Sequence, residues 1–282
     1  CNAISYIGAD HLFIDVDRDT MGLSPAKMEE YLSANAEIRD DGAYLKKTNR
    51  RIAACVPMHS FGQALRIKEL TQLCERYKIP LVEDAAESLG TTVDGKHTGT
   101  FGLLGVYSFN GNKTVTCGGG GAIVTDNEAL AKKAKHLTTQ AKVPHRWEFV
   151  HDAIGYNYRL PNINAALACA QMEQLEVFIA DKRETTAAYR EFFTKMGVPF
   201  VSELPGVRSN CWLFPLLLND RKERDEFLTY TNDNGVMTRP AWKLMNQLEM
   251  FKDAMKGDLG NAEWLDDRLV NIPSSARMKK TK

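Results

Sequence analysis

The sequence predicts an α/β protein, with a large domain built on a mostly parallel β-sheet and a smaller α+β domain at the C-terminal end. Three observations carry this prediction. Short apolar segments alternate with helical patterns in the first half of the chain, one long helical pattern follows, and a few short elements come after it. Ligands of such sheets bind beyond the C-terminal ends of the strands, so a site is expected there.

The first half of the chain reads strand, helix, strand, helix, strand. An apolar run at residues 12–16 predicts the first strand, and Ser24 followed by Pro25 is typical of a helix start. The order continues with a strand at 52–56, a helix at 65–77 and a strand at 80–84 that ends on Glu83-Asp84. This alternation favours parallel strands with helices on both faces of the sheet.

The second half contains one long helical pattern. Residues 162–195 keep helical spacing and weaken only near Asp181, and Leu167, Met172 and Leu175 on this pattern are expected in the core. Because long helices often bridge domains, we expect a large domain at 1–184 and a small domain at 185–282. The remaining predicted elements are strands at 106–109 and 122–125, a helix at 128–137, a strand at 212–218, a helix at 222–232 and a strand at 236–239.

Composition excludes several classes of protein. The 282 residues are 44% hydrophobic and 26% charged, and 36 basic residues balance 36 acidic ones, so no net field favours nucleic acid or an anionic membrane. No apolar run approaches the roughly 20 residues that span a bilayer. The six cysteines are scattered without a CxxC pair, which fits a reducing cytoplasm. The start at Cys1, without Met and directly in apolar sequence, leads us to expect an N-terminally truncated chain.

Three polar side chains follow neighbouring apolar strands. Asp84 ends one strand, and Ser108 and Lys113 lie five residues apart after the next. Asp84 could equally cap a turn, and most lone loop lysines are only solvated. Lys113 is a stronger candidate for a functional role because it precedes the four-glycine run 118–121, where the backbone can approach a bulky group. The glycines alone are weak evidence, since they match neither GxGxxG nor the P-loop spacing.

An acid, a hydroxyl and a lysine at successive strand ends match the needs of pyridoxal phosphate. The lysine amine bonds to the cofactor, the acid keeps the pyridine nitrogen protonated, and hydroxyls and amides hold the phosphate. The combination is stronger evidence than any of its parts.

Longer motifs support this interpretation. The strings EDAAESLG, GTFG, YSFNGNK, TCGGGGAIVTD, GYNYRLPNINAALACAQMEQLE and NIPSS resemble the sugar aminotransferases of the DegT/DnrJ/EryC1/StrS family across essentially the whole chain. That resemblance implies the type I fold of pyridoxal-phosphate-dependent transferases. Several strings are most similar to the branch that aminates a nucleotide-linked 4-keto-6-deoxy-N-acetylhexosamine on the way to bacillosamine or legionaminic acid.

The resemblance also implies roles for five residues. Lys113 would be the Schiff-base lysine, Asp84 the partner of the pyridine nitrogen and Ser108 a ligand of the phosphate. Glu87 falls where the wider family usually has Gln beside the cofactor ring, which leaves its role open. Asn157 in GYNYR would reach the phosphate of a neighbouring subunit, so the resemblance implies a homodimer with shared active sites.

Four further residues are candidates for the substrate site. His59 in PMHSFG would assist near the cofactor or be a buried, bonded histidine, and Arg159 would aid an anionic ligand or form a structural ion pair. Arg239 and Trp242 come from the part of the chain where the family places some of its sugar pocket. The other histidines show no metal-ligand spacing, so no metal is assigned: His11, His97, His136, His145 and His151.

The expected activity is amino transfer, with glutamate as donor and the keto sugar as acceptor. One family feature is absent, an N-terminal Gly-Thr turn that opens a phosphate-gripping helix. A catalytically impaired fragment or a non-catalytic cofactor-binding member is therefore an alternative. A sugar dehydratase of the family would carry histidine in place of Lys113, a regulator lacks support from a basic helix-turn-helix, and a nicotinamide-dependent oxidoreductase lacks its phosphate fingerprint.

Overall fold

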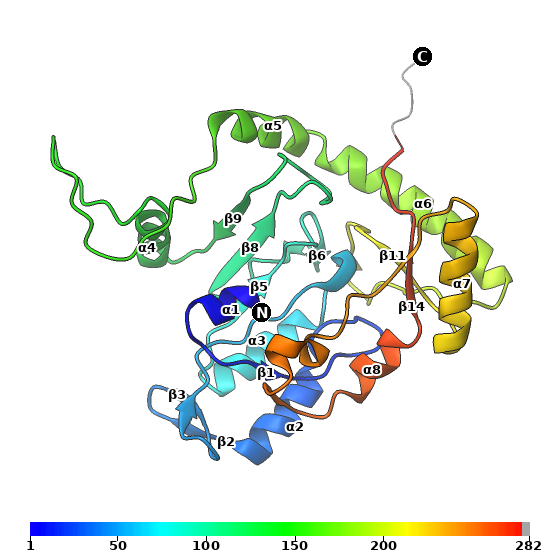
Figure 1. The fold of residues 1–282 in the computed structure, drawn as a ribbon, viewed down its shortest axis with the longest axis horizontal. Coiled ribbons are helices and arrows are strands. Elements are labelled where there is room, and N and C mark those ends of the chain that lie inside the picture. The colour runs from blue at the N-terminus through cyan, green and yellow to red at the C-terminus, as the bar shows by residue number, and fades with distance from the viewer. Residues whose placement is uncertain (278–282) are drawn as a thin grey trace.

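The computed structural model describes residues 1–277 of the chain (Figure 1). Its central sheet has the strand order β5 (Val82–Asp84), β8 (Leu104–Ser108), β9 (Gly121–Val124). β5 and β8 are parallel and β9 runs antiparallel to β8. Close approach of β9 to β8 requires glycine at 121, because a Cβ there would lie 2.5 Å from the Tyr107 carbonyl oxygen. Parallel β5 and β8 end at the same edge, as the sequence predicted.

Two helices pack beside this sheet and supply the main core. α2 (Pro25–Asn35) begins at Ser24, whose side chain accepts the Lys27 N–H, and α3 (Ile67–Arg76) buries an apolar face against it. Both helices form where the sequence predicted them. Leu32, Ile67 and Leu70 are fully buried in this core, which holds the two helices together.

The segment at 52–56 is not a regular strand. It runs parallel beside β5 through only two isolated bridges, Cys55 with Leu81 and Met58 with Asp84. Pro57 between them has no N–H to donate, which limits the ladder. The predicted strand at 12–16 shortens to β1 (Leu12–Phe13), paired in parallel with β13 (Met255–Lys256).

The long helical pattern is two helices. α5 (Asn162–Met172) and α6 (Leu175–Lys195) run one after the other along one side of the molecule (Figure 1). The interruption falls at residues 173–174, whereas α6 continues through Asp181, so the predicted weak point was wrong. The expected domain boundary at 184 lies inside α6.

The C-terminal part is α+β, as predicted. Its antiparallel sheet has the order β11 (Phe214–Leu217), β14 (Leu269–Ile272), β12 (Arg239–Pro240), and α7 (Arg221–Asp233) lies beside it (Figure 1). β12 is an edge strand, the position in which a proline is tolerated. The predicted strand at 236–239 reaches the sheet only at Arg239.

Apart from α4, the remaining elements are short or were not predicted by the sequence. They are α1 (Asn2–Tyr6), the meander β2 (Ala36–Arg39), β3 (Gly42–Leu45) and β4 (Arg50–Arg51), β6 (Thr92–Val93), β7 (Lys96–His97), α4 (Glu128–Thr138), which was predicted, β10 (Val207–Arg208), α8 (Gly260–Asp266), and the 3-10 turns Ser60–Gly62, Met245–Gln247 and Glu249–Phe251. Within residues 1–277, no helix is long and apolar enough to cross a membrane.

Candidate active site

The Lys113 amine lies between a carboxylate and an aromatic ring. Its Nζ is 3.7 Å from Glu87 Oε1 and 4.1 Å from the centre of the Trp212 ring, and the side chain is 14% exposed. Lys113 belongs to the loop between β8 and β9, and its N–H donates to the Asn110 carbonyl. The predicted lysine therefore lies in a largely buried site, with a polar group on one side and an aromatic ring on the other.

Glu87 is buried beside this amine. Its Oε2 accepts the Phe61 N–H at 2.7 Å, which leaves Oε1 facing Lys113. Burial raises the pKa of Glu87 to about 7; the Phe61 N–H and the Lys113 charge oppose this rise, while the nearby Asp84 carboxylate adds to it. Phe61 adopts a left-handed backbone conformation (φ 60°) to aim this N–H. Glu87 therefore changes charge close to neutral pH.

Asn210 fixes the Glu87 loop to Trp212. Its Nδ2 donates to the Glu87 carbonyl and its Oδ1 accepts the Trp212 N–H, each at 2.9 Å. Asn210 is fully buried, and Gly62 makes room for it: a Cβ on Gly62 would lie 2.0 Å from Asn210 Oδ1. One amide side chain thus sets the relative position of the two groups that flank Lys113.

Trp242 joins the site through an aromatic stack. Its ring lies 5.6 Å from Phe61 and 6.2 Å from Trp212, with interplanar angles of 11° and 10°. Trp242 is 52% exposed, and with Phe61 it lines a mainly apolar pocket of about 360 Å³. The structure therefore brings this sequence-predicted residue to the same site as Lys113.

Asp84 and Ser108 stand at neighbouring strand ends. β5 and β8 are in parallel register with Asp84 opposite Val106, so both side chains leave the same edge of the sheet. Asp84 Oδ1 accepts the Ala86 N–H at 3.1 Å, and Ser108 Oγ accepts the Asn110 N–H at 3.3 Å. The sheet brings an acid and a hydroxyl to the edge where the Lys113 loop begins.

His59 is held entirely within the protein. It is completely buried, with Nε2 3.0 Å from Glu83 Oε2, and Nδ1 accepts the Leu65 N–H at 3.4 Å. Burial alone would raise the pKa of Glu83, but hydrogen bonds from His59 and from the Gly99 and Gly102 N–H groups hold that pKa below its usual value. These contacts favour the buried, bonded alternative over a role near the cofactor.

Three other predicted residues do not gather around Lys113. Asn157 and Arg159 lie on residues 139–160, the arm, which extends away from the body between α4 and α5 (Figure 1). Both are exposed, and Arg159 Nε donates to Asn157 Oδ1 at 2.8 Å. Arg239 is exposed on β12, where its guanidinium lies 3.5 Å from the Met237 sulfur. Within this chain Arg159 contacts Asn157 and Gln140, both on the arm.

Sequence reasoning missed three residues of the site. Trp212 was assigned only to the start of a strand, and Phe61 was passed over beside His59. Aromatic side chains next to polar site candidates are the signal that could have marked both. Asn210 carries no such signal, because the partners of its Nδ2 are more than 90 residues away in sequence.

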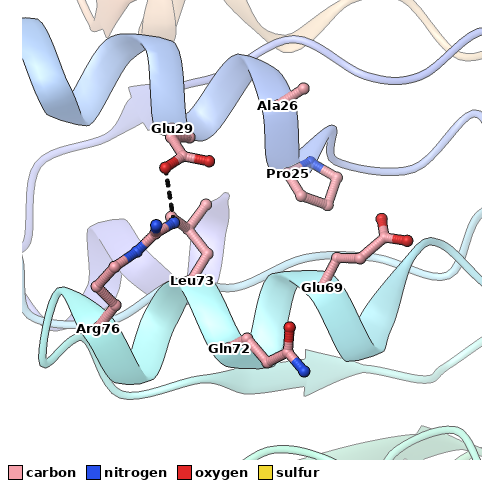
Figure 2. Close-up of a pocket in the computed structure, with 7 residues that line it drawn as sticks. All are labelled: Pro25, Ala26, Glu29, Glu69, Gln72, Leu73 and Arg76. Atoms are coloured by element: carbon pink, nitrogen blue, oxygen red, sulfur yellow. Dashed lines mark ion pairs between the residues drawn. The ribbon is translucent and has the colours of Figure 1, made fainter.

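One groove among the described residues lies apart from this site. A groove of about 450 Å³ between α2 and α3 is lined by Glu29, Glu69 and Arg76, and the Arg76–Glu29 ion pair of 2.7 Å crosses it (Figure 2). It contains none of the predicted site residues. From residue 1 to residue 277, no group of three or more His, Cys, Asp or Glu side chains could hold a metal ion.

Comparison with known proteins agrees with this fold. The chain belongs to the DegT/DnrJ/EryC1/StrS aminotransferase family, whose profile matches residues 1–282. It is 35% identical over 282 residues to EpsN of Bacillus subtilis, a proposed pyridoxal phosphate-dependent aminotransferase, covering 98% of this chain and 70% of that protein. It is 32% identical over 273 residues to the GDP-perosamine synthase of Escherichia coli O157:H7, covering 97% and 70%.

Solved structures of the family share the fold. A DegT/DnrJ/EryC1/StrS aminotransferase from Brucella abortus superposes with a TM-score of 0.88 at 25% identity, covering 99% of this chain and 72% of that one. The aminotransferase TlmJ from Streptoalloteichus hindustanus gives 0.87 at 26% identity, with the same coverage. The type I fold predicted from the sequence is confirmed, and the chain is a pyridoxal-phosphate-dependent aminotransferase.

The residues of the site fit this cofactor. A largely enclosed lysine amine can bond to its aldehyde, and the carboxylate at the end of β5 and the hydroxyl at the end of β8 match its pyridine nitrogen and phosphate in chemical character. The fit rests on the donor set that the parallel strand ends bring together.

Proposed function

We propose that this aminotransferase moves an amino group from glutamate to the 4-keto group of a nucleotide-linked 4-keto-6-deoxy-N-acetylhexosamine, a precursor of bacillosamine- or legionaminic-type sugars. The observation that carries the proposal is the Lys113 amine, enclosed between Glu87 and Trp212 at the edge where Asp84 and Ser108 end their strands. Because such activated sugars are made inside the cell, we place the reaction in the cytoplasm.

Each residue at the strand ends has one task in this proposal. Lys113 holds the cofactor covalently, Asp84 pairs with its pyridine nitrogen, and Ser108 binds its phosphate. When bound, pyridoxal phosphate supplies a ring that accepts electrons from the carbon bearing the amino group. The freed Lys113 Nζ moves a proton on and off that carbon. Glu87, which lies beside Lys113, is placed next to the cofactor ring.

The arm suggests that a second copy completes the site. Leu167 and Met172, expected in the core, are 46% and 42% exposed on α5, which contradicts that expectation. Large apolar side chains are exposed on the arm and α5, as they are at protein interfaces: Trp147, Phe149, Ile154, Tyr158 and Ile163. In a homodimer, Asn157 on the arm would reach the cofactor phosphate of the partner.

Trp242, Arg239 and Arg159 are proposed to contact the nucleotide sugar. The assignment of Trp242 is supported by its place in the aromatic stack. Both arginines are exposed, and their assignment is supported by the family resemblance alone. We propose the division of the chain into domains 1–184 and 185–282 because a long helix, α6, joins the two parts of the chain. The relatives named GDP-perosamine synthase favour a second candidate substrate, a GDP-linked keto sugar.

The test uses nitrogen-15 glutamate with either a UDP-linked or a GDP-linked 4-keto-6-deoxy sugar, and mass spectrometry of the sugar product. Transfer of the label to the UDP-linked N-acetyl sugar supports the proposal, and transfer only to the GDP-linked sugar selects the second candidate. A protein that binds pyridoxal phosphate at Lys113 but transfers no label from glutamate would contradict the proposed reaction.

A further inference from the structure

Trp212 is fixed through all of its polar groups. Its N–H donates to Asn210 Oδ1 at 2.9 Å, its carbonyl accepts from Lys182 Nζ at 3.2 Å and Ser274 Oγ at 2.9 Å, and its indole N–H donates to the Asn112 carbonyl at 2.8 Å. Its side chain is almost fully buried. The hydrogen bonds at the backbone N–H, the carbonyl and the indole N–H together hold the Trp212 ring in one orientation.

Part of this fixation comes from a buried lysine. Lys182 on α6 lies in the protein interior, where burial lowers its pKa to about 8. Its Nζ also contacts the Ser274 carbonyl, so one amine joins the Trp212 carbonyl to the segment after β14. A buried amine costs free energy unless it is hydrogen-bonded, and these carbonyls supply the bonds.

The fixed ring acts on two consecutive residues of the Lys113 loop. The indole N–H holds the carbonyl of Asn112, the residue just before Lys113, and the ring face lies 4.1 Å from Lys113 Nζ. Attraction between an ammonium and an indole face is strongest when both are desolvated. The two contacts together fix both the backbone and the far end of the lysine side chain.

We infer that Trp212 is a positioning residue for Lys113, which holds the loop through its indole N–H and the amine through its ring face. The C-terminal part of the chain thereby sets where the reactive nitrogen sits. This inference rests on the proposed role of Lys113 in holding the cofactor. The alternative is that Trp212 only fills space between the two parts of the chain.

The variant that separates these alternatives is Trp212→Phe. It keeps an aromatic ring in the core but removes the indole N–H and weakens the attraction for the ammonium. Trp264→Phe is the matched control, because the Trp264 ring also carries cations, Arg18 at 4.5 Å and Arg268 at 4.6 Å, outside the described site. Ser274→Ala is the second variant, since it removes one hydrogen bond to the Trp212 carbonyl and leaves the ring in place.

The first measurement is the rate at which trinitrobenzenesulfonate modifies Lys113 in the full chain before cofactor is added, followed by peptide mapping. We expect Trp212→Phe to speed the modification of Lys113 about threefold, because the loop and amine are released. Lys96, which lies over the Phe101 ring, is the internal reference and should not change. Ser274→Ala should give a smaller increase, and Trp264→Phe none.

The second measurement is the rate of pyridoxal phosphate capture at Lys113, trapped with borohydride. It should fall about tenfold in Trp212→Phe, since a mobile amine meets the aldehyde less often in the right geometry. Unchanged rates of modification and capture in both Trp212→Phe and Ser274→Ala would overturn the inference. If the wild-type chain captures no cofactor at Lys113, the proposed function fails, while the modification rates still test the positioning of Lys113.

Discussion

The Lys113 site and the arm are built in opposite ways. Around Lys113, groups from distant segments are buried and bonded to one another: Glu87 to Phe61, and Asn210 to both Glu87 and Trp212. Along the arm, contacts are local and exposed, as in the bond between Arg159 and Asn157 and the bridge between Lys142 and His151. Ile154 on the arm is 89% exposed.

This difference separates what one chain supplies alone from what it supplies to a partner. Buried polar groups with partners give a fixed arrangement that holds without another surface. Large exposed apolar groups with local contacts gain free energy only when a second surface covers them. Variants in the two regions should therefore affect different measurements.

The largest effect is expected on catalysis at Lys113. Lys113→Ala removes the group proposed to bond covalently to the cofactor and to move the proton, and turnover should fall by at least about 10³-fold. Lys96→Ala, which removes another lysine over an aromatic ring, is the control and should retain activity. The assay is transfer of labelled nitrogen, and an active Lys113→Ala protein would refute the assignment.

The next largest effect is expected on stability at His59. His59→Ala leaves the buried Glu83 carboxylate without its imidazole partner, and the free energy of unfolding should fall by about 3 kcal/mol. The matched variant on the arm is His151→Ala, whose exposed bond to the Gln140 carbonyl should cost no more than about 0.5 kcal/mol. Urea unfolding of both variants measures the contrast, and equal losses would contradict it.

Glu87 should make stability depend on pH. Its folded pKa of about 7 lies above the usual value of 4.5, so between these pH values the folded state binds more protons and the free energy of unfolding decreases as pH rises. Below pH 4.5 Glu87 is protonated in both the folded and the unfolded state, so the free energy of unfolding does not change with pH. Above a pH of about 7 the decrease in the free energy of unfolding is complete and amounts to about 3 kcal/mol. The glutamine in Glu87→Gln does not titrate. The free energy of unfolding of this variant, relative to wild type, should therefore increase by up to this amount between acid and weakly alkaline pH.

Thermal or urea unfolding of the full chain without added cofactor, across that pH range, gives the comparison. The difference between Glu87→Gln and wild type should grow with pH and then level off above neutrality. A difference that stays constant with pH would show that Glu87 does not carry the raised pKa.

The smallest effect on stability is expected on the arm. Ile154→Ser should change the free energy of unfolding by no more than about 0.5 kcal/mol, because the side chain is already exposed. Self-association should weaken instead, by about tenfold, if this surface meets a second copy. Sedimentation of the wild type and the variant measures this, and unchanged association would remove the arm from the interface.

The sequence predicted the elements whose signals are local. The helix after Ser24, the strand ending at Asp84 and the helix predicted at 128–137 follow from caps and periodicity within each segment. The interruption at 173–174 was misplaced, because no proline or glycine marks it. The meander at residues 36–51 was missed, since β2 and β4 are largely exposed, β3 is largely buried, and none of the three strands has a strong alternating pattern.

The site was predictable only in part, for a physical reason. Asp84, Ser108 and Lys113 follow strands, so their shared edge comes from the rule for parallel sheets. Asn210 and Trp212 reach the site through contacts between segments about 100 or more residues apart, and Phe61 reaches Glu87 across 26 residues. No local pattern encodes these contacts, and the positions of Asn210 and Trp212 depend on how the C-terminal part packs on the sheet.

The most direct test of Lys113 as the cofactor-holding residue is borohydride reduction of the full chain incubated with pyridoxal phosphate, followed by peptide mapping. We expect a visible absorbance band that borohydride removes, with the cofactor bonded to the peptide that contains Lys113. A reduced cofactor bonded to another lysine, or spread over several, would contradict the role of Lys113.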